Sequence, residues 1–207
     1  YVVINDALCD SYTEDDFKNN MGTITLVSQD GGNYSFVNIK AYENYLVSSV
    51  SVDSGKIYNK YQPEVVFELE EEENGKEYFL HDVYGNQLSL QDVMPQDILS
   101  VTQRGDSGFT DITVVNEKVS GTLDGSSEEF YIIGGGEVEI AHSFQNALDA
   151  GLVTMPQIGE AVTAALDLDG KVAGILEEGT FSGTLALVVD AAADSGVSAG
   201  YSFAFLT

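Results

Sequence analysis

The stretch "DGGNYSFVNIKAYENYLVSSVSVDSGKIYNKY" covers Asp30–Tyr61 and contains the pattern that decides the fold. Apolar, β-branched and aromatic residues alternate with polar residues in two runs, Tyr34–Tyr42 and Tyr45–Val52. Alternation with a period of two is typical of β-strands that bury one face. Asp30-Gly31 and Ser54-Gly55 flank these runs, and such pairs accept the backbone conformations that tight turns need. The stretch therefore predicts consecutive strands joined by short turns.

The same alternation continues along most of the chain and predicts an all-β protein. Turn residues recur about every eight to twelve positions, as they do in β-sandwiches and small barrels. Three prolines among 207 residues leave most strands free to form ladders. The other predicted strands are Gly22–Gln29, Lys56–Tyr61, Glu64–Glu70, Glu77–Val83, Asp97–Gln103, Thr110–Asn116, Lys118–Leu123 and Glu129–Gly135. Short helices are expected at Tyr12–Asn20, Ser143–Gly151 and Asp190–Gly196.

A repeated tripeptide indicates that one structural unit occurs twice. Met-Pro-Gln stands at Met94–Gln96 and again at Met155–Gln157, each time before a predicted hairpin. Ser-Gly-Thr also recurs, within Lys118–Ile133 and within Thr180–Leu206, and both segments resemble an opening hairpin. Proline fixes φ near −65° and excludes a helix, so it suits the entrance of a strand. We therefore expect a duplicated β unit in which the tripeptide serves as scaffold.

The expected fold class is all-β, with tandem small β-barrel or β-sandwich modules and a few short helices. The first module, with an N-terminal extension, would span residues 1–117, and the second would span residues 118–207. The C-terminal hairpin of the second module is a candidate start of a further repeat. Because the chain begins within a predicted strand at Tyr1, we interpret it as a fragment or processed form of a larger secreted protein.

The net charge of the chain limits the kinds of partner that it can bind. Eight Lys and Arg residues stand against 34 Asp and Glu residues, which gives a net charge of −26. A surface this negative repels phosphate backbones, so nucleic acid is not an expected partner. No apolar stretch reaches the roughly 18 residues that a membrane helix needs, so no membrane insertion is expected. Cys9 is the single cysteine, so no disulfide can form within the chain.

Several segments together resemble the β-rich repeat regions of bacterial S-layer-type cell-surface proteins, which also carry S-layer homology anchoring domains. They are Asp30–Tyr61, "MPQDILSV" (Met94–Val101), "KVSGTL" (Lys118–Leu123), "GEAVTAALDLDGKVAGI" (Gly159–Ile175) and "GTLALVVDAAADSGV" (Gly183–Val197). The resemblance implies an extracellular, cell-wall-associated architectural segment. It supplies no catalytic residues to carry over. The partners that it implies are a cell-wall polymer or neighbouring surface-protein modules.

Metal binding is the most plausible chemistry in the sequence. "DLDGK" places Asp167 and Asp169 two residues apart before Gly170, which is part of the pattern of a calcium loop. A complete loop needs a further acid and a distal Glu, so a plain hairpin turn is the favoured interpretation. We expect no cofactor, with calcium at Asp167 and Asp169 as the alternative.

Tyrosines and carboxylates offer two other kinds of site. Tyr42, Tyr45, Tyr58 and Tyr61 are candidates for stacking on sugars or on a protein partner. Tyrosines that close the rim of a barrel would show the same pattern. The acidic run Glu68–Phe79 predicts a hairpin that projects into water. An acid-pair glycoside hydrolase needs two carboxylates at a set separation in a cleft, which the sequence does not indicate.

The sequence thus supports three hypotheses in descending order. The first is a non-catalytic structural or spacer segment of a bacterial cell-surface protein, located in the cell wall and outside the cell. The second is a glycan- or protein-binding module that uses exposed tyrosines. The third is an acid-pair hydrolase, although we expect no enzymatic activity.

Overall fold

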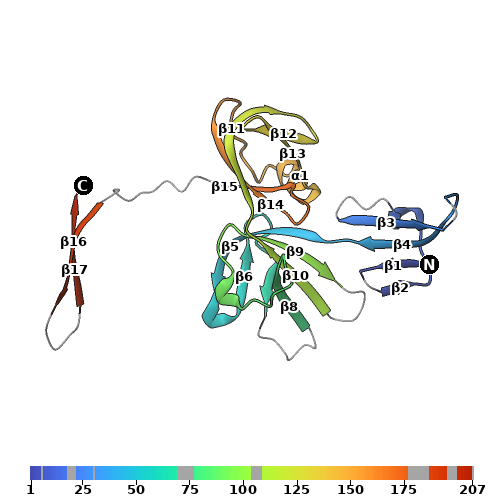
Figure 1. Cartoon of the computed structure of the whole chain (residues 1–207), viewed down its shortest axis with the longest axis horizontal. Coiled ribbons are helices and arrows are strands. Elements are labelled where there is room, and N and C mark those ends of the chain that lie inside the picture. The colour runs from blue at the N-terminus through green and yellow to red at the C-terminus, as the bar shows by residue number, and fades with distance from the viewer. Residues whose placement is uncertain are drawn as a thin grey trace. The chain divides into compact units, whose positions relative to one another are not determined.

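The computed structural model shows an all-β protein with few short helices, which confirms the predicted class (Figure 1). It describes residues 1–5, 7–17, 22–29, 31–69, 77–103 and 109–176, together with the backbone of 187–194 and 200–206. Contacts within the chain separate one compact unit, Tyr1–Leu176, from a second, Glu177–Thr207. Within the described residues no sheet closes into a barrel, so the modules are open sheets.

The strands of the first unit follow the alternating segments of the sequence. They are β1 (Val2–Ile4), β2 (Ala7–Cys9), β3 (Thr23–Ser28), β4 (Tyr34–Lys40), β5 (Glu43–Ser51), β6 (Lys56–Asn59), β7 (Val66–Glu68), β8 (Glu77–Asp82), β9 (Ile98–Gln103), β10 (Phe109–Val115), β11 (Lys118–Ser126), β12 (Phe130–Ile133), β13 (Gly136–Glu139), β14 (Ala161–Leu166) and β15 (Val172–Leu176). The second unit contains β16 (Leu187–Asp194) and β17 (Gly200–Leu206). The helices are the short 3-10 turns η1 (Glu14–Phe17), η2 (Val52–Ser54) and η4 (Leu90–Asp92), and the α-helix α1 (His142–Asp149).

The described strands form four sheets. The N-terminal sheet has the order β2-β1-β4-β3, and a two-stranded sheet contains β16 and β17. The first β module is the six-stranded sheet β7-β6-β5-β9-β10-β8, and the second β module is the five-stranded sheet β13-β12-β11-β14-β15. Each module has its own apolar core, with Ile57, Leu99 and Ile112 in the first and Phe144 and Val172 in the second.

Each module starts with a long strand that changes partner half-way, which we call the bent strand. In β5, Glu43–Leu46 pairs with β9, and the part from Val47 onward pairs with β6. In β11, the residues before Leu123 pair with β14, and those from Leu123 onward pair with β12. Both strands carry a register shift at the change, between Val47 and Ser49 and between Leu123 and Gly125. A bulge adds a bend and twist, so it lets one strand serve two partners.

The entrance to β9 in the first module is the same as the entrance to β14 in the second, but it does not coincide with the repeated tripeptide. The backbone N–H of Val47 donates to the carbonyl of Asp97, and the carbonyl of Val47 accepts the N–H of Gln96. In the same way, the N–H of Leu123 donates to the carbonyl of Glu160, and the carbonyl of Leu123 accepts the N–H of Gly159. The Asp97 carboxylate accepts from the amide of Met94 at 2.8 Å, and that of Glu160 accepts from Gln157 at 2.8 Å. Met94 is therefore equivalent to Gln157 and not to Met155. The duplication is present, displaced by two residues from the motif that indicated it.

The two modules differ at one sheet edge. In the first, β8 pairs in parallel with β10 along its whole length. In the second, a single parallel bridge joins Ile140 to Val172, and the chain then enters α1. The second module is thus a five-stranded sheet with a helix between β13 and β14.

Two of the expected local structures are wrong. Asp190–Gly196 does not begin as a helix, because β16 runs to Asp194 and pairs with β17. Alanine has the highest intrinsic helix propensity, but such propensities are small and ladder formation overrides them. Glu68–Phe79 is not a hairpin of paired strands, because β7 and β8 lie at opposite ends of the sheet order. Residues 70–76, within that acidic run, lie outside the described part of the chain.

The predicted boundary between residues 117 and 118 lies at the end of the short link between β10 and β11, directly before Lys118. Whether the two parts are separate domains stays a prediction. Among the described residues, no helix is both long enough and apolar enough to cross a membrane.

Candidate functional site: the junction between the two β modules

Asp167 organises the tight turn between β14 and β15. One carboxylate oxygen, Oδ1, accepts the backbone N–H groups of Asp169 at 3.0 Å and Lys171 at 2.8 Å. Gly170 has φ 76°, a left-handed conformation that glycine adopts without strain. The segment has the geometry of a hairpin turn that is closed by an acidic side chain, as the favoured interpretation of "DLDGK" expects.

The other oxygen of Asp167 faces the first β module. Oδ2 accepts the side-chain amide of Asn44 at 2.8 Å, and the Tyr42 hydroxyl lies 3.4 Å away. The same hydroxyl donates to Asp169 Oδ2 at 2.5 Å. Asn44 is held in turn by Ser100, which donates to its Oδ1 at 2.7 Å across the β5–β9 ladder. A hydrogen-bonded network thus connects the start of the first module to the last turn of the second.

Burial governs the ionisation of this network. Asp167 is 3% exposed, and its desolvation raises the pKa of its carboxyl despite the hydrogen bonds that it accepts. Desolvation likewise raises the pKa of the Tyr42 hydroxyl, and the bond to Asp169 adds to the shift. Tyr42 is therefore a neutral donor at physiological pH. The Lys171 ammonium lies 2.9 Å from Glu139, whose hydrogen bond raises the pKa of the lysine.

An apolar cluster lies in the same junction. It combines residues of the first module with residues of the second: Leu46, Ile98 and Val115, and Ala141, Ala165, Ala173 and Leu176. Gly174 lies against Leu46, because a Cβ at this position would come within 2.9 Å of Leu46 Cδ2. Two modules that share an apolar cluster and a buried polar network resist relative motion.

The structure brings together three of the six candidate site residues. Asp167, Asp169 and Tyr42 meet in the junction, and each is occupied by the hydrogen bonds described above. Tyr61 lies in the junction as well, with its ring 5.9 Å from that of Phe144 and its hydroxyl accepting the amide of Ile175 at 3.3 Å.

The remaining two tyrosines lie in the first module. Tyr45 packs edge-on against Phe67 at 5.2 Å, and its hydroxyl donates to the Glu43 carboxylate. Tyr58 is half-buried on β6. Each of the four tyrosines is thus at least half-buried, and three of them hold a hydroxyl partner. A binding role for them stays a prediction.

N–H and O–H donors surround the carboxylates of Asp167 and Asp169. Calcium takes about six to eight oxygen ligands, whereas N–H and O–H groups point at these carboxylates. In the part of the chain that the structure describes, no group of three or more His, Cys, Asp or Glu side chains could hold a metal ion. Calcium at Asp167 and Asp169 stays a prediction.

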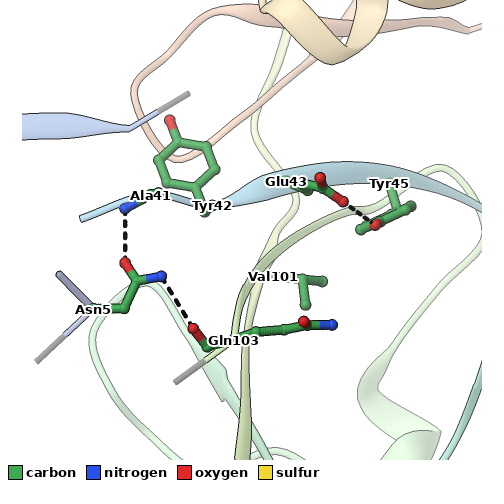
Figure 2. A pocket seen from close by; sticks show the side chains of 7 residues that line it. All are labelled: Asn5, Ala41, Tyr42, Glu43, Tyr45, Val101 and Gln103. Atoms are coloured by element: carbon green, nitrogen blue, oxygen red, sulfur yellow. Dashed lines mark hydrogen bonds between the residues drawn. The ribbon is translucent and has the colours of Figure 1, made fainter. Parts of the chain in front are cut away.

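A pocket of about 230 Å³ opens where the N-terminal sheet meets the first module (Figure 2). Asn5 spans its floor, accepting the amide of Ala41 at 2.8 Å and donating to the carbonyl of Gln103 at 3.0 Å. Tyr42 and Tyr45 also line it. Among the described residues that line it, Glu43 is the one carboxylate, whereas an acid-pair hydrolase needs two.

Sequence reasoning missed Asn44, Ser100 and Asn5. No local pattern marks them, because their partners lie 123, 56 and 98 residues away along the chain. Comparison of the chain with protein-family models, with curated proteins and with solved structures finds no match in any of the three.

Proposed function

We propose that this chain is a non-catalytic structural segment of a bacterial cell-surface protein of the S-layer type, in which repeated β modules act as spacers. The observation that carries the proposal is the repetition of one backbone pairing scheme in the first and second β modules. A spacer needs the same backbone shape to recur. Unlike an enzyme, it does not need particular catalytic side chains at fixed positions. The resemblance of the sequence to S-layer-type repeats points the same way.

The junction suits this role. Leu46 of the first module packs in one apolar cluster with Ala173 and Leu176 of the second, and the Tyr42–Asp167 network crosses the same junction. Relative motion is the default for modules with small polar contacts, and an apolar junction reduces it. Successive modules that are held in this way keep fixed positions relative to one another along a polypeptide.

The charge suits a location outside the cell, in the cell wall. A net charge of −26 keeps the segment soluble and away from anionic polymers such as nucleic acid. The partners that fit are neighbouring surface-protein modules or a cell-wall polymer without a high negative charge.

An antibody raised against the purified chain tests the location in the bacterium that produces the protein. We expect the antibody to label intact cells, and a protease added to intact cells to remove the label. Labelling that requires permeabilised cells would contradict the proposal. An antibody against a cytoplasmic protein serves as the control for lysis.

A second candidate function is glycan binding, and the pocket in Figure 2 favours it. Tyr42, Tyr45, Glu43 and Gln103 combine aromatic rings with polar groups there, as sugar sites do.

A glycan array probed with the chain tests this candidate. Gln103→Ala removes an exposed side chain of the pocket and should weaken binding at least tenfold. Gln91→Ala, at an exposed glutamine of η4 that does not line this pocket, should leave it unchanged. An array without signal leaves the spacer function as the better account.

A further inference from the structure

The pocket in Figure 2 lies on one face of the β5–β9 ladder. Glu43 and Val101 stand opposite each other in this ladder, and Tyr45 and Gln103 each follow two residues later on their strand. Side chains two residues apart on a strand point to the same face, so these four side chains share it. Val101 belongs to the apolar core of the first β module, and Tyr45 packs against that core. The pocket is therefore a mouth of the core, with the exposed Glu43 and Gln103 at its rim.

The hydroxyl donors of this pocket are engaged within the protein. Tyr42 donates to Asp169, and Tyr45 donates to Oε2 of the Glu43 carboxylate. The other oxygen of that carboxylate, Oε1, keeps its lone pairs for a ligand. The side-chain amide of Gln103 can both donate and accept. The pocket therefore offers a ligand one charged acceptor and one amide.

The charge of the pocket favours a cationic ligand. Glu43 is the one charged side chain among the described residues that line it, and the chain as a whole has a net charge of −26. A carboxylate beside an aromatic ring attracts a cation twice, through an ionic hydrogen bond and through the ring face. Burial, and then the bond to Glu43, raises the pKa of Tyr45, so its hydroxyl stays a donor at neutral pH. This hydroxyl holds the carboxylate in place before a ligand arrives, which lowers the entropic cost of binding.

We propose that this pocket binds an amino sugar whose amine is free and carries a positive charge. The ammonium group donates to Glu43 Oε1, the sugar ring lies on the apolar surface of Tyr45 and Val101, and a hydroxyl pairs with the Gln103 amide. A lysine side chain also carries an ammonium group, but its aliphatic stem has no hydroxyl for Gln103, so the pocket favours the sugar. The proposal rests on the second candidate function, glycan binding, and names the class of its ligand.

Isothermal titration calorimetry of the whole chain with three small ligands tests the class. The ligands are a glucosamine disaccharide with free amines, the same disaccharide with N-acetylated amines, and trilysine. Salt at about 0.15 M screens the long-range attraction between the acidic chain and any cation. The free-amine sugar should bind at least tenfold more tightly than the N-acetylated sugar, because acetylation removes the charge that Glu43 recognises. Trilysine should bind more weakly than the free-amine sugar.

Three variants locate the interaction. Glu43→Gln removes the charge but keeps an oxygen for the Tyr45 hydroxyl, and it should weaken binding of the free-amine sugar at least tenfold. Glu137→Gln is the matched control, because it removes the same charge from an exposed glutamate of β13 that does not line the pocket. Tyr45→Phe keeps the ring but releases the carboxylate, and it should weaken binding by about threefold to tenfold. Circular dichroism of each variant checks that its strands are retained.

Equal losses of affinity in Glu43→Gln and Glu137→Gln would overturn the proposal, because net charge alone would then attract the amine. Tighter binding of trilysine than of the free-amine sugar would overturn it in favour of a basic peptide. Tighter binding of the N-acetylated sugar would overturn it and leave glycan binding intact. No binding of either sugar up to about 10 mM would contradict glycan binding as well. The labelling of intact cells, which tests the spacer function, does not depend on any of these results.

Discussion

Before β9, in the first β module, the residue with left-handed backbone is Gln96, with φ 75°; before β14, in the second, it is Gly159, with φ 96°. The next residue is Asp97 in one module, which is buried, and Glu160 in the other, which is exposed. Both acids accept the amide of the residue three positions earlier. The backbone scheme is the same although the side chains that build it are not.

This comparison shows which features define the module. Both modules contain the bulge in the first strand, the same strand entrance before β9 or β14, and the hairpin β9–β10 or β14–β15. The sheet edge differs, because β8 occupies it in the first module and the chain enters α1 there in the second. Backbone pairing satisfies the N–H and C=O groups of any sequence that can form strands, so it tolerates wide exchange of side chains. Differences between the modules are therefore differences in how each core is filled.

The largest expected effect follows from the helix that only the second module has. Phe144 of α1 is fully buried, and Phe144→Ala should lower the free energy of unfolding by about 3–5 kcal/mol. Asn146→Ala, exposed on the same helix, should change it by less than about 0.5 kcal/mol. Urea denaturation measures both. Equal effects would mean that α1 does not fill the second core.

A smaller effect is expected where the modules touch. Gly174→Ala places a Cβ 2.9 Å from Leu46 Cδ2, so the Leu46 side chain must move; because Leu46 is buried, we expect a cost of about 1–3 kcal/mol. Gly136→Ala is the control, because its nearest atom would lie 3.6 Å away and its φ is not positive. If urea denaturation shows the same stability for both variants, Leu46 does not pack on Gly174 in solution.

Exchanging the entrance residues tests their equivalence. Gln96→Gly should stabilise the protein by about 1 kcal/mol, because glycine adopts a positive φ without strain. Gly159→Gln should destabilise it by about 1–2 kcal/mol for the same reason, since no atom lies close enough to obstruct the new side chain. Thermal unfolding of both variants measures the pair. Changes in melting temperature with the same sign for the two variants would contradict the equivalence of Gln96 and Gly159.

The smallest expected effect is a difference in pH dependence. Burial raises the pKa of Asp97, so the folded state binds a proton more readily than the unfolded state. Stability therefore falls as pH rises through the interval between the ordinary pKa and the raised one. Acidification from neutral pH should thus stabilise the protein, and Asp97→Asn should reduce this gain by about 1–3 °C in melting temperature.

Glu160→Gln, at the equivalent exposed position, is the control for that titration. Acidification also reduces repulsion among all the carboxylates, so only the difference between the two variants is diagnostic. At lower pH the trend should reverse, because hydrogen bonds from Asn86 and Ser89 lower the pKa values of Asp82 and Asp92. Identical melting curves for the two variants would mean that Asp97 is not buried.

The strands could be predicted because their signal is local. Alternation marks Thr23–Ser28 and Tyr34–Lys40 regardless of where the chain goes next. The junction could not be predicted, because Tyr42 and Asp167 come together only through folding and neither stands in a pattern that names the other. Ala191–Ala193 shows the opposite error, since local preference favoured a helix and pairing with β17 made a strand.

The sequence predicted that a β unit occurs twice, but it did not predict which residues of the two copies are equivalent. Met-Pro-Gln occurs twice, yet Pro95 is equivalent to Ile158, and Pro156 lies two residues before that position. A tripeptide fixes φ locally, whereas register is set by the bulge and by the ladder on either side of it.

Hydrogen-bond couplings across the ladder, measured by NMR, test the central claim most directly. The account predicts a coupling from the Val47 amide to the carbonyl of Asp97 and one from the Leu123 amide to that of Glu160. A coupling from Leu123 to Ile158 would place the tripeptides in register and contradict the scheme. The absence of any coupling from Leu123 to this segment would mean that the second module does not repeat the first.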